Sequence, residues 1–220
     1  MSEVEGDLSV WAVVVARTGP TAKSRLGPVL DCGQRIGLAR AMLADVVAAC
    51  RRAELRGPVV VTEGEATRRR LAGEGLPAAA DDGTDMNLAV RLGIAAAREA
   101  GAGAVVVLPG DVPLVSPADL LALAACATRD PQEAPVVGVA PDRVGQGTNA
   151  LALRPPDVIA PRFGPRSARR HLALARRAGV AACLVRLPTL AFDVDTPDDL
   201  ARLRRYRPQG ETGGLLATLR

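Results

Sequence analysis

The sequence predicts an α/β protein with three layers, in which helices cover both faces of a mostly parallel mixed sheet. Short apolar, β-branched runs alternate with segments whose apolar residues recur at helical spacing. Strands that alternate with helices of this length imply right-handed crossovers, and therefore parallel neighbours. The 220 residues are 48% hydrophobic, which is enough for one sizeable core and too little chain for two full domains.

The expected elements follow from these runs and from the residues that punctuate them. The strands are expected at residues 10–16, 58–62, 104–109, 135–140, 150–154 and 182–187. The helices are expected at residues 34–53, 65–74, 86–100, 117–128, 167–178 and 197–206. Ser116 and Thr196 each precede a proline, which predicts a capped helix start at both places. Residues 1–206 therefore form the expected domain, and residues 207–220 a flexible tail with little apolar periodicity.

The composition excludes several classes of function. The net charge of +4 is spread along the chain and aromatics are 2% of it, so neither a basic nucleic-acid face nor base-stacking platforms are indicated. The four cysteines form no Cys-x-x-Cys pair, so no zinc site is signalled. The acidic start and the lack of any apolar run near 20 residues argue against a signal peptide or a membrane partner. We expect a cytoplasmic protein, with a homodimer left open.

The loop after the first expected strand is basic. It contains Arg17, Lys23 and Arg25 together with a glycine and several hydroxyls. Ligands of open α/β sheets bind at the carboxyl ends of the strands, so these amides and cations are expected to hold a triphosphate. The ending of a Walker loop is absent. A solvated basic loop is the alternative.

Three aspartates follow strands or extended segments. Asp111 lies between glycine and proline after the run at 104–109, and Asp193 and Asp195 project from one side of an extended segment. Magnesium prefers such carboxylates together with phosphate oxygens. Asp111 could instead form a turn with its own backbone. Capping by Asp195 or Thr196 would explain one of the last pair and leave Asp193 unexplained.

A second glycine-containing region predicts an anion site. The segment 145–150 contains Thr148, and the segment 162–167 contains Gly164 and leads into a helix near Ser167. Backbone amides and hydroxyls at a helix N-terminus bind carboxylates or phosphates. His171 lies one turn after Ser167, but a lone histidine on a short helix is more often a packing residue. We therefore leave it out of the catalytic set.

These pieces, in this order, resemble the phospholactate/phosphoenolpyruvate guanylyltransferase family, which takes part in making the deazaflavin coenzyme F-420. The resemblance runs from Trp11 to about Arg204. The matching motifs are Ala22-Lys23-Ser24-Arg25-Leu26, Met86-Asn87-Leu88-Ala89, Leu108-Pro109-Gly110-Asp111-Val112-Pro113-Leu114, Gly147-Thr148-Asn149-Ala150-Leu151, Phe163-Gly164-Pro165-Arg166-Ser167 with His171, and Asp193-Val194-Asp195-Thr196-Pro197-Asp198-Asp199-Leu200. The aspartate motif is common among nucleotidyltransferases, whereas the Gly-Thr-Asn-Ala-Leu and Phe-Gly-Pro-x-Ser pair is much more specific.

The resemblance implies a GT-A-like nucleotidyltransferase fold that uses GTP, Mg²⁺ and a small phosphorylated acid. It implies four sets of site residues: Lys23, Arg25 and Asp111 as catalytic; Asp111, Asp193 and Asp195 on the metal; Thr148, Gly164 and Ser167 on the acid; and Arg17, Lys23, Ser24, Arg25 and Asn87 on the nucleotide. The family usually carries a lysine shortly after the first strand. Arg17 keeps the charge there but has a planar, forked head.

The expected reaction is attack by a phosphate oxygen of the acid on the α-phosphorus of GTP, with pyrophosphate leaving. An ionised phosphate needs no general base, which suits a site of carboxylates and cations. A sugar-nucleotide glycosyltransferase on the same fold and a non-catalytic nucleotide-binding domain are the alternatives. The absence of Gly-x-Gly-x-x-Gly argues against a dinucleotide-binding oxidoreductase. The acid stays open among phosphoenolpyruvate, 2-phospholactate and a phosphoglycerate, although an Arg- and Ala-rich chain suggests a GC-rich bacterial genome, for which the resemblance favours phosphoenolpyruvate.

Overall fold

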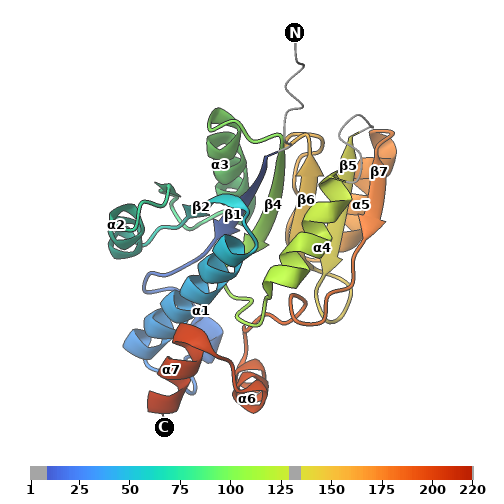
Figure 1. The fold of residues 1–220 in the computed structure, drawn as a ribbon. Helices are drawn as coiled ribbons and strands as arrows, with labels where there is room; N and C mark the ends of the chain where they lie inside the picture. Colours follow the sequence, from blue (N-terminus) through green and yellow to red (C-terminus); the bar gives the residue numbers. More distant parts are fainter. Residues whose placement is uncertain (1–8, 129–134, 220) are drawn as a thin grey trace.

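The computed structural model of the chain describes residues 9–128 and 135–219 (Figure 1). The strands are β1 (Val10–Val15), β2 (Arg56–Val61), β3 (Ala78–Ala79), β4 (Ala104–Pro109), β5 (Val136–Pro141), β6 (Thr148–Arg154) and β7 (Ala181–Leu184). The helices are α1 (Cys32–Arg52), α2 (Glu65–Gly73), α3 (Met86–Glu99), α4 (Pro117–Thr128), α5 (Ser167–Arg177), α6 (Pro197–Tyr206) and α7 (Gly210–Thr218), with a 3-10 helix η1 at Ser24–Leu26. The expected alternation of strands and helices is confirmed.

The described strands form one sheet in the order β3-β2-β1-β4-β6-β5-β7. All neighbouring pairs are parallel except the two that involve β6, which runs against β4 and β5. This is the mostly parallel mixed sheet that the sequence predicts. Because β6 is reversed, its first residue, Thr148, lies at the edge where the neighbouring strands end.

Helices cover both faces of the sheet. Alternate residues of β1 point to opposite faces, so Ala12 and Val14 pack in one apolar cluster and Val13 and Val15 in another. The first cluster includes residues of α1 and α4, and the second includes residues of α3 and α5. Figure 1 shows α1 and α4 in front of the sheet and α3 and α5 behind it. The three-layer prediction is therefore confirmed.

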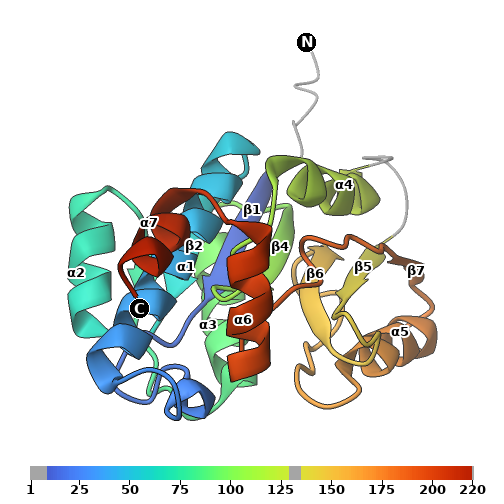
Figure 2. The ribbon, with the colours of Figure 1, turned by 90° about the horizontal axis from the view of Figure 1, so that it is seen from below.

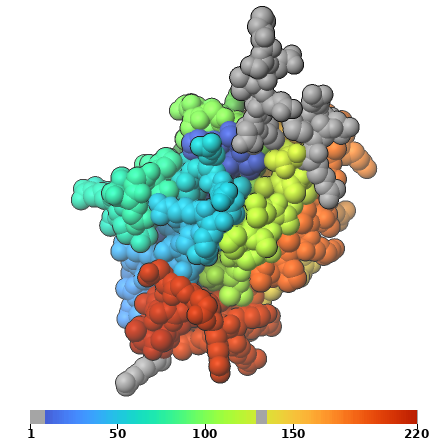
Figure 3. All heavy atoms as spheres, in the orientation of Figure 1, coloured from blue at the N-terminus to red at the C-terminus, as the bar shows by residue number. Residues whose placement is uncertain are grey.

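The C-terminal helices cover the carboxyl edge of the sheet. Figure 2 looks onto this edge and shows α6 and α7 lying across it. A third apolar cluster joins Leu216 and Leu219 to Met42 of α1, and Figure 3 shows the C-terminal segment packed beside α1. None of the helices in the described ranges combines the length and hydrophobicity that crossing a bilayer requires.

Helix α7 is a correction, since we expected a flexible tail from residue 207 onward. Residues Gly210–Thr218 form a helix. Its first amides are bound from outside, because the carboxylate of Asp45 on α1 accepts from Glu211 N and Thr212 N at 2.9 Å each. A cap supplied by a distant residue leaves no local signal. The acidic N-terminal segment that argues against a signal peptide, residues 1–8, lies outside the described residues.

Candidate active site

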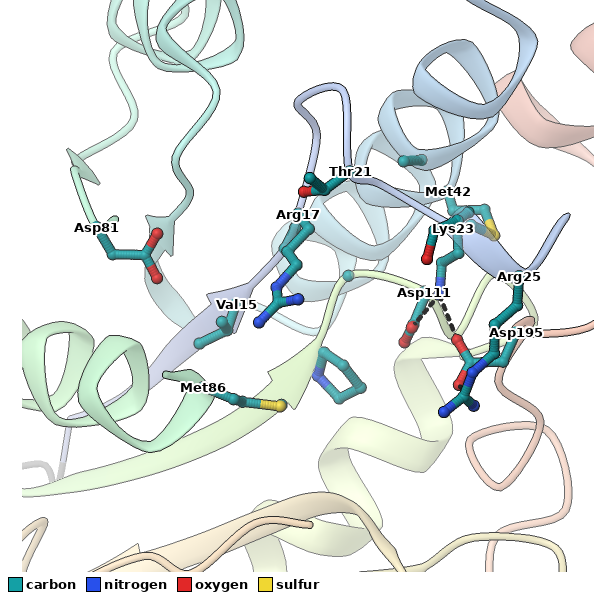
Figure 4. A pocket seen from close by; sticks show the side chains of 15 residues that line it. Val15, Arg17, Thr21, Lys23, Arg25, Met42, Asp81, Met86, Asp111 and Asp195 are labelled. Atoms are coloured by element: carbon teal, nitrogen blue, oxygen red, sulfur yellow. Dashed lines mark hydrogen bonds and ion pairs between the residues drawn. The ribbon is translucent and has the colours of Figure 1, made fainter. Parts of the chain in front are cut away.

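A buried lysine joins two of the predicted acidic residues. Lys23 Nζ donates to Asp195 Oδ1 at 2.9 Å and also to Asp111 Oδ2 (Figure 4). The Lys23 side chain is only 10% exposed, whereas Arg25 is 74% exposed and lies 3.5 Å from Asp195 Oδ2. Lys23 therefore supplies a fixed positive charge, and Arg25 a mobile one on the solvent side.

Backbone contacts bring Asp111 and the 193–195 segment together. Val194 N donates to Asp111 O at 3.2 Å, which aligns this segment with the end of β4. Gly110 N donates to Val15 O at 2.9 Å. A Cβ at Gly110 would lie 2.7 Å from the Cβ of Ala16, so only glycine allows this close approach of the loop to β1.

The start of α6 leaves Asp195 available. Thr196 caps the helix, since its hydroxyl accepts from Asp199 N at 3.3 Å and Asp199 Oδ2 accepts from Thr196 N at 2.9 Å. Asp199 also pairs with Arg143 at 2.5 Å. Of the two alternatives for the cap, Thr196 is confirmed. The Asp195 carboxylate therefore faces Lys23 and Arg25 alone among the described cations.

Negative charge accumulates around Asp111. Burial, with the nearby Asp111 charge, raises the pKa of Asp193. Burial alone would lower the pKa of Lys23, but the charges of Asp111 and Asp195 outweigh it and the pKa is raised. Asp111 Oδ1 is buried without a hydrogen-bond partner. These oxygens suit a hard divalent cation, although no three Asp, Glu, His or Cys side chains in the described ranges are already arranged around one.

A cavity of about 380 Å³ opens beside these residues (Figure 4). Six of the predicted site residues line it: Arg17, Lys23, Ser24, Arg25, Asp111 and Asp195. The cavity lies over the carboxyl ends of β1 and β4, which are neighbours in the sheet. The other predicted residues lie outside its lining: Asn87, Thr148, Gly164, Ser167 and Asp193.

Two loops that we expected to bind anions through backbone amides already hold carboxylates of this chain. Glu63 Oε1 accepts from Thr18 N at 3.1 Å and from Gly19 N at 2.9 Å. Asp142 likewise accepts from Gln146 N and Gly147 N, both at 2.9 Å. The amides of Thr18 and Gly19 are therefore already bonded, and only the side chains of the first loop are left for the anion expected there. Glu63 was missed, although it lies two residues after the end of β2, at the carboxyl edge of the sheet.

A second group of predicted residues lies where β6 and α5 begin, and consists of Thr148, Gly164 and Ser167. Thr148 is 7% exposed and Ser167 is 1% exposed. Ala168 N donates to Gln146 O at 3.1 Å, which fixes the first turn of α5 against the residues before β6. Ser167 Oγ has no hydrogen-bond partner, and Gly164 has a φ of 113°, which favours glycine. A buried, unpartnered hydroxyl at a helix N-terminus is suited to an anionic ligand.

The Asn87 side chain contacts the loop of this second group and does not line the cavity. Its side chain donates to Phe163 O at 3.3 Å and accepts from Phe163 N at 2.7 Å. This pair ties the start of α3 to the loop that contains Gly164. Both ends of the Asn87 amide are engaged in this backbone clamp, and the nucleotide contact expected of Asn87 stays a prediction.

Comparison with known families identifies the family of this chain. A model of the family described as guanylyl transferase CofC like matches residues 12–207. The chain belongs to this family. The guanylyltransferase is 42% identical to a phosphoenolpyruvate guanylyltransferase of Rubrobacter xylanophilus, over 92% of this chain and 99% of that protein. It is 34% identical to a 3-phospho-D-glycerate guanylyltransferase of Phenylobacterium zucineum, over 95% and 96% of the two chains.

Solved structures of other proteins support a nucleotidyltransferase fold for the guanylyltransferase. A nucleotide-diphospho-sugar transferase structure from Desulfovibrio desulfuricans G20 matches with a TM-score of 0.74 at 19% identity, over 95% of this chain and 94% of that one. A Mycobacterium tuberculosis H37Rv protein solved in complex with manganese matches with a TM-score of 0.59 at 23% identity, over 89% and 97%. The chain is a nucleotidyltransferase with the fold that the sequence predicts.

Proposed function

We propose that this guanylyltransferase transfers GMP from GTP to phosphoenolpyruvate and releases pyrophosphate, a step in coenzyme F-420 biosynthesis. The observation that carries the proposal is Lys23, a buried cation held between Asp111 and Asp195 on the wall of the cavity. This charge pattern suits a polyphosphate together with a cation. The relative at 42% identity favours phosphoenolpyruvate over the phosphoglycerate of the relative at 34%.

The nucleophile is a phosphate oxygen of the acid. It forms a bond to the α-phosphorus of GTP while the bond from that phosphorus to the bridging oxygen of pyrophosphate breaks. An ionised phosphate carries no proton that must be removed, so the site needs no general base. The chain's own contribution is positioning and neutralisation of negative charge, mainly by Lys23 and Arg25, with Arg17 and Ser24 on the triphosphate.

We propose that Mg²⁺ is the metal and that Asp111, Asp193 and Asp195 hold it. The unpartnered Asp111 Oδ1 and the raised pKa of Asp193, which burial and the charge of Asp111 cause, support a cation here. When bound, the metal supplies charge neutralisation at the phosphates. The manganese complex of a structural relative supports a divalent ion of this kind.

The acid lies at the second group of residues, with its carboxylate toward Thr148, Ser167 and the backbone near Gly164. A phosphate that must reach the α-phosphorus cannot also be bound at a helix N-terminus, whereas the carboxylate needs only neutral donors there. The buried, unpartnered Ser167 hydroxyl supports this orientation. The phosphate then faces Asp111 and the cavity.

An assay of pyrophosphate release tests this function against its alternatives. The protein would be incubated with magnesium, each of the four nucleoside triphosphates, and phosphoenolpyruvate, 2-phospholactate or 3-phosphoglycerate. We expect release that requires both GTP and phosphoenolpyruvate. Release driven only by a sugar phosphate would favour a sugar nucleotidyltransferase, and GTP binding without release would favour a non-catalytic domain.

A further inference from the structure

His171 is a fully buried residue of α5 with two hydrogen bonds of different kinds. Its exposure is 0%. Its Nε2 accepts from the backbone N–H of Arg162 at 2.9 Å, and its Nδ1 lies 3.0 Å from Thr148 Oγ1. The ring also packs edge-on against Phe163, with 5.2 Å between ring centroids. The histidine thus connects β6, α5 and the loop between them.

These contacts fix the position of the ring proton. A backbone amide can only donate, so Nε2 of His171 must accept and carries no proton. A neutral imidazole then has its proton on Nδ1. Burial lowers the pKa of His171 to about 4, which keeps the ring neutral near pH 7. It follows that Nδ1–H donates to the hydroxyl oxygen of Thr148.

The direction of this hydrogen bond determines what Thr148 can offer a ligand. Its oxygen accepts from His171, so its own hydrogen is free for another acceptor. No other hydrogen-bond partner of this hydroxyl occurs within residues 9–128 and 135–219. Toward the ligand, Thr148 is therefore preset as a donor.

We propose that His171 is a positioning residue that orients the Thr148 hydroxyl as a hydrogen-bond donor to the carboxylate of the acid substrate. The inference rests on the proposed function for the identity of the acid. Without Nδ1–H, the Thr148 hydrogen could turn toward residue 171 and leave the carboxylate facing a lone pair. The arrangement selects a ligand group that accepts, such as a carboxylate, over one that donates.

Two substitutions of His171 each keep one of its two hydrogen bonds and remove the other. An asparagine amide reaches about as far as Nδ1, so His171→Asn can still donate to Thr148. The longer glutamine amide reaches the Nε2 position, so His171→Gln can accept from Arg162 N but loses the donor to Thr148. Ala175→Gly is the control, because Ala175 is a buried residue of α5 that takes no part in either bond.

Steady-state kinetics of the full chain read out the difference. We expect His171→Gln to raise the KM for the acid about tenfold, with the KM for GTP within about twofold. His171→Asn should recover most of the acid KM, and Ala175→Gly should change neither. In a Thr148→Val background the two His171 variants should have the same acid KM. Equal acid KM values for the Asn and Gln variants with Thr148 intact would overturn the proposal.

A second measurement is independent of activity. His171 is the only histidine of the sequence, so its nitrogen signals can be read in untagged protein labelled with ¹⁵N-histidine. We expect long-range ¹H–¹⁵N spectra at pH 7 to show a protonated Nδ1 and a bare Nε2. A protonated Nε2 would refute the preset donor even if the enzyme is active. Wild-type protein that forms no product with any acid, but shows this tautomer, would instead refute the proposed function alone.

Discussion

Lys23 and Asp195 are 172 positions apart in the sequence, and their side chains meet at 2.9 Å. The same ammonium also contacts Asp111, so a single buried cation joins the loop after β1, the end of β4 and the segment before α6. A charge buried in this way is fixed in position before any ligand binds. Such preorganised charge is more effective on a transition state than charge on mobile surface groups.

Replacing Lys23 should therefore affect turnover more than replacing Arg25. We expect Lys23→Gln to lower kcat/KM by about 100-fold or more. Arg25→Ala should mainly raise the KM for GTP, because this side chain is 74% exposed and lies at the rim of the cavity. Initial-rate kinetics with each substrate varied in turn provide the comparison. An equal rise in both KM values for Arg25→Ala would indicate general collapse of the loop instead.

Asp193→Asn tests the proposed metal site. The change removes a charged oxygen donor and no core packing, so most activity should be lost while the fold is kept. Burial and the charge of Asp111 disfavour an ionised Asp193, so the thermal midpoint of the metal-free protein should be no lower than in the wild type. Magnesium should raise the wild-type midpoint and leave the variant's nearly unchanged. Near-normal turnover of the variant in magnesium would rule out this ligand.

Ser167→Ala tests the acid site with little risk to the fold. Ser167 Oγ is buried and unpartnered, so its loss should not destabilise the free protein. In the complex it would remove a charge-assisted hydrogen bond of roughly 1.5–3 kcal/mol, which corresponds to a ten- to hundredfold weaker acid affinity. Isothermal titration should show unchanged GTP binding. A lower thermal midpoint with unaltered acid affinity would assign Ser167 a structural role.

The pH dependence of stability should carry a contribution from His171. Its folded pKa of about 4 lies below the value of about 6.5 expected in the unfolded chain. Between these values the unfolded state binds more protons, so stability is lost as the pH falls from 6.5 toward 4, by up to about 3 kcal/mol. Urea unfolding at several pH values measures this loss. The difference in the free energy of unfolding between the wild type and His171→Asn should shrink with falling pH. A difference that stays constant would contradict the lowered pKa of His171.

The sheet and the place of Asp111 at its carboxyl edge could be predicted because both depend on general rules. Alternating apolar runs predict parallel strands, and residues that follow such strands meet at one edge. The reversal of β6, which carries Thr148 to that edge, leaves no mark in its apolar run. The hydrogen-bond acceptors of the loop amides at Gly19 and Gly147 could not be predicted either. Glu63 and Asp142 are ordinary polar loop residues until the fold places them against those amides.

The mass of the product tests the transfer of GMP to phosphoenolpyruvate most directly. GTP, magnesium and phosphoenolpyruvate would be incubated with the protein and the mixture examined by mass spectrometry, with 2-phospholactate and 3-phosphoglycerate in parallel. We expect a species with the mass of GMP joined to phosphoenolpyruvate with loss of water, formed together with pyrophosphate. Folded protein that binds GTP but yields no such adduct from any of the three acids would contradict it.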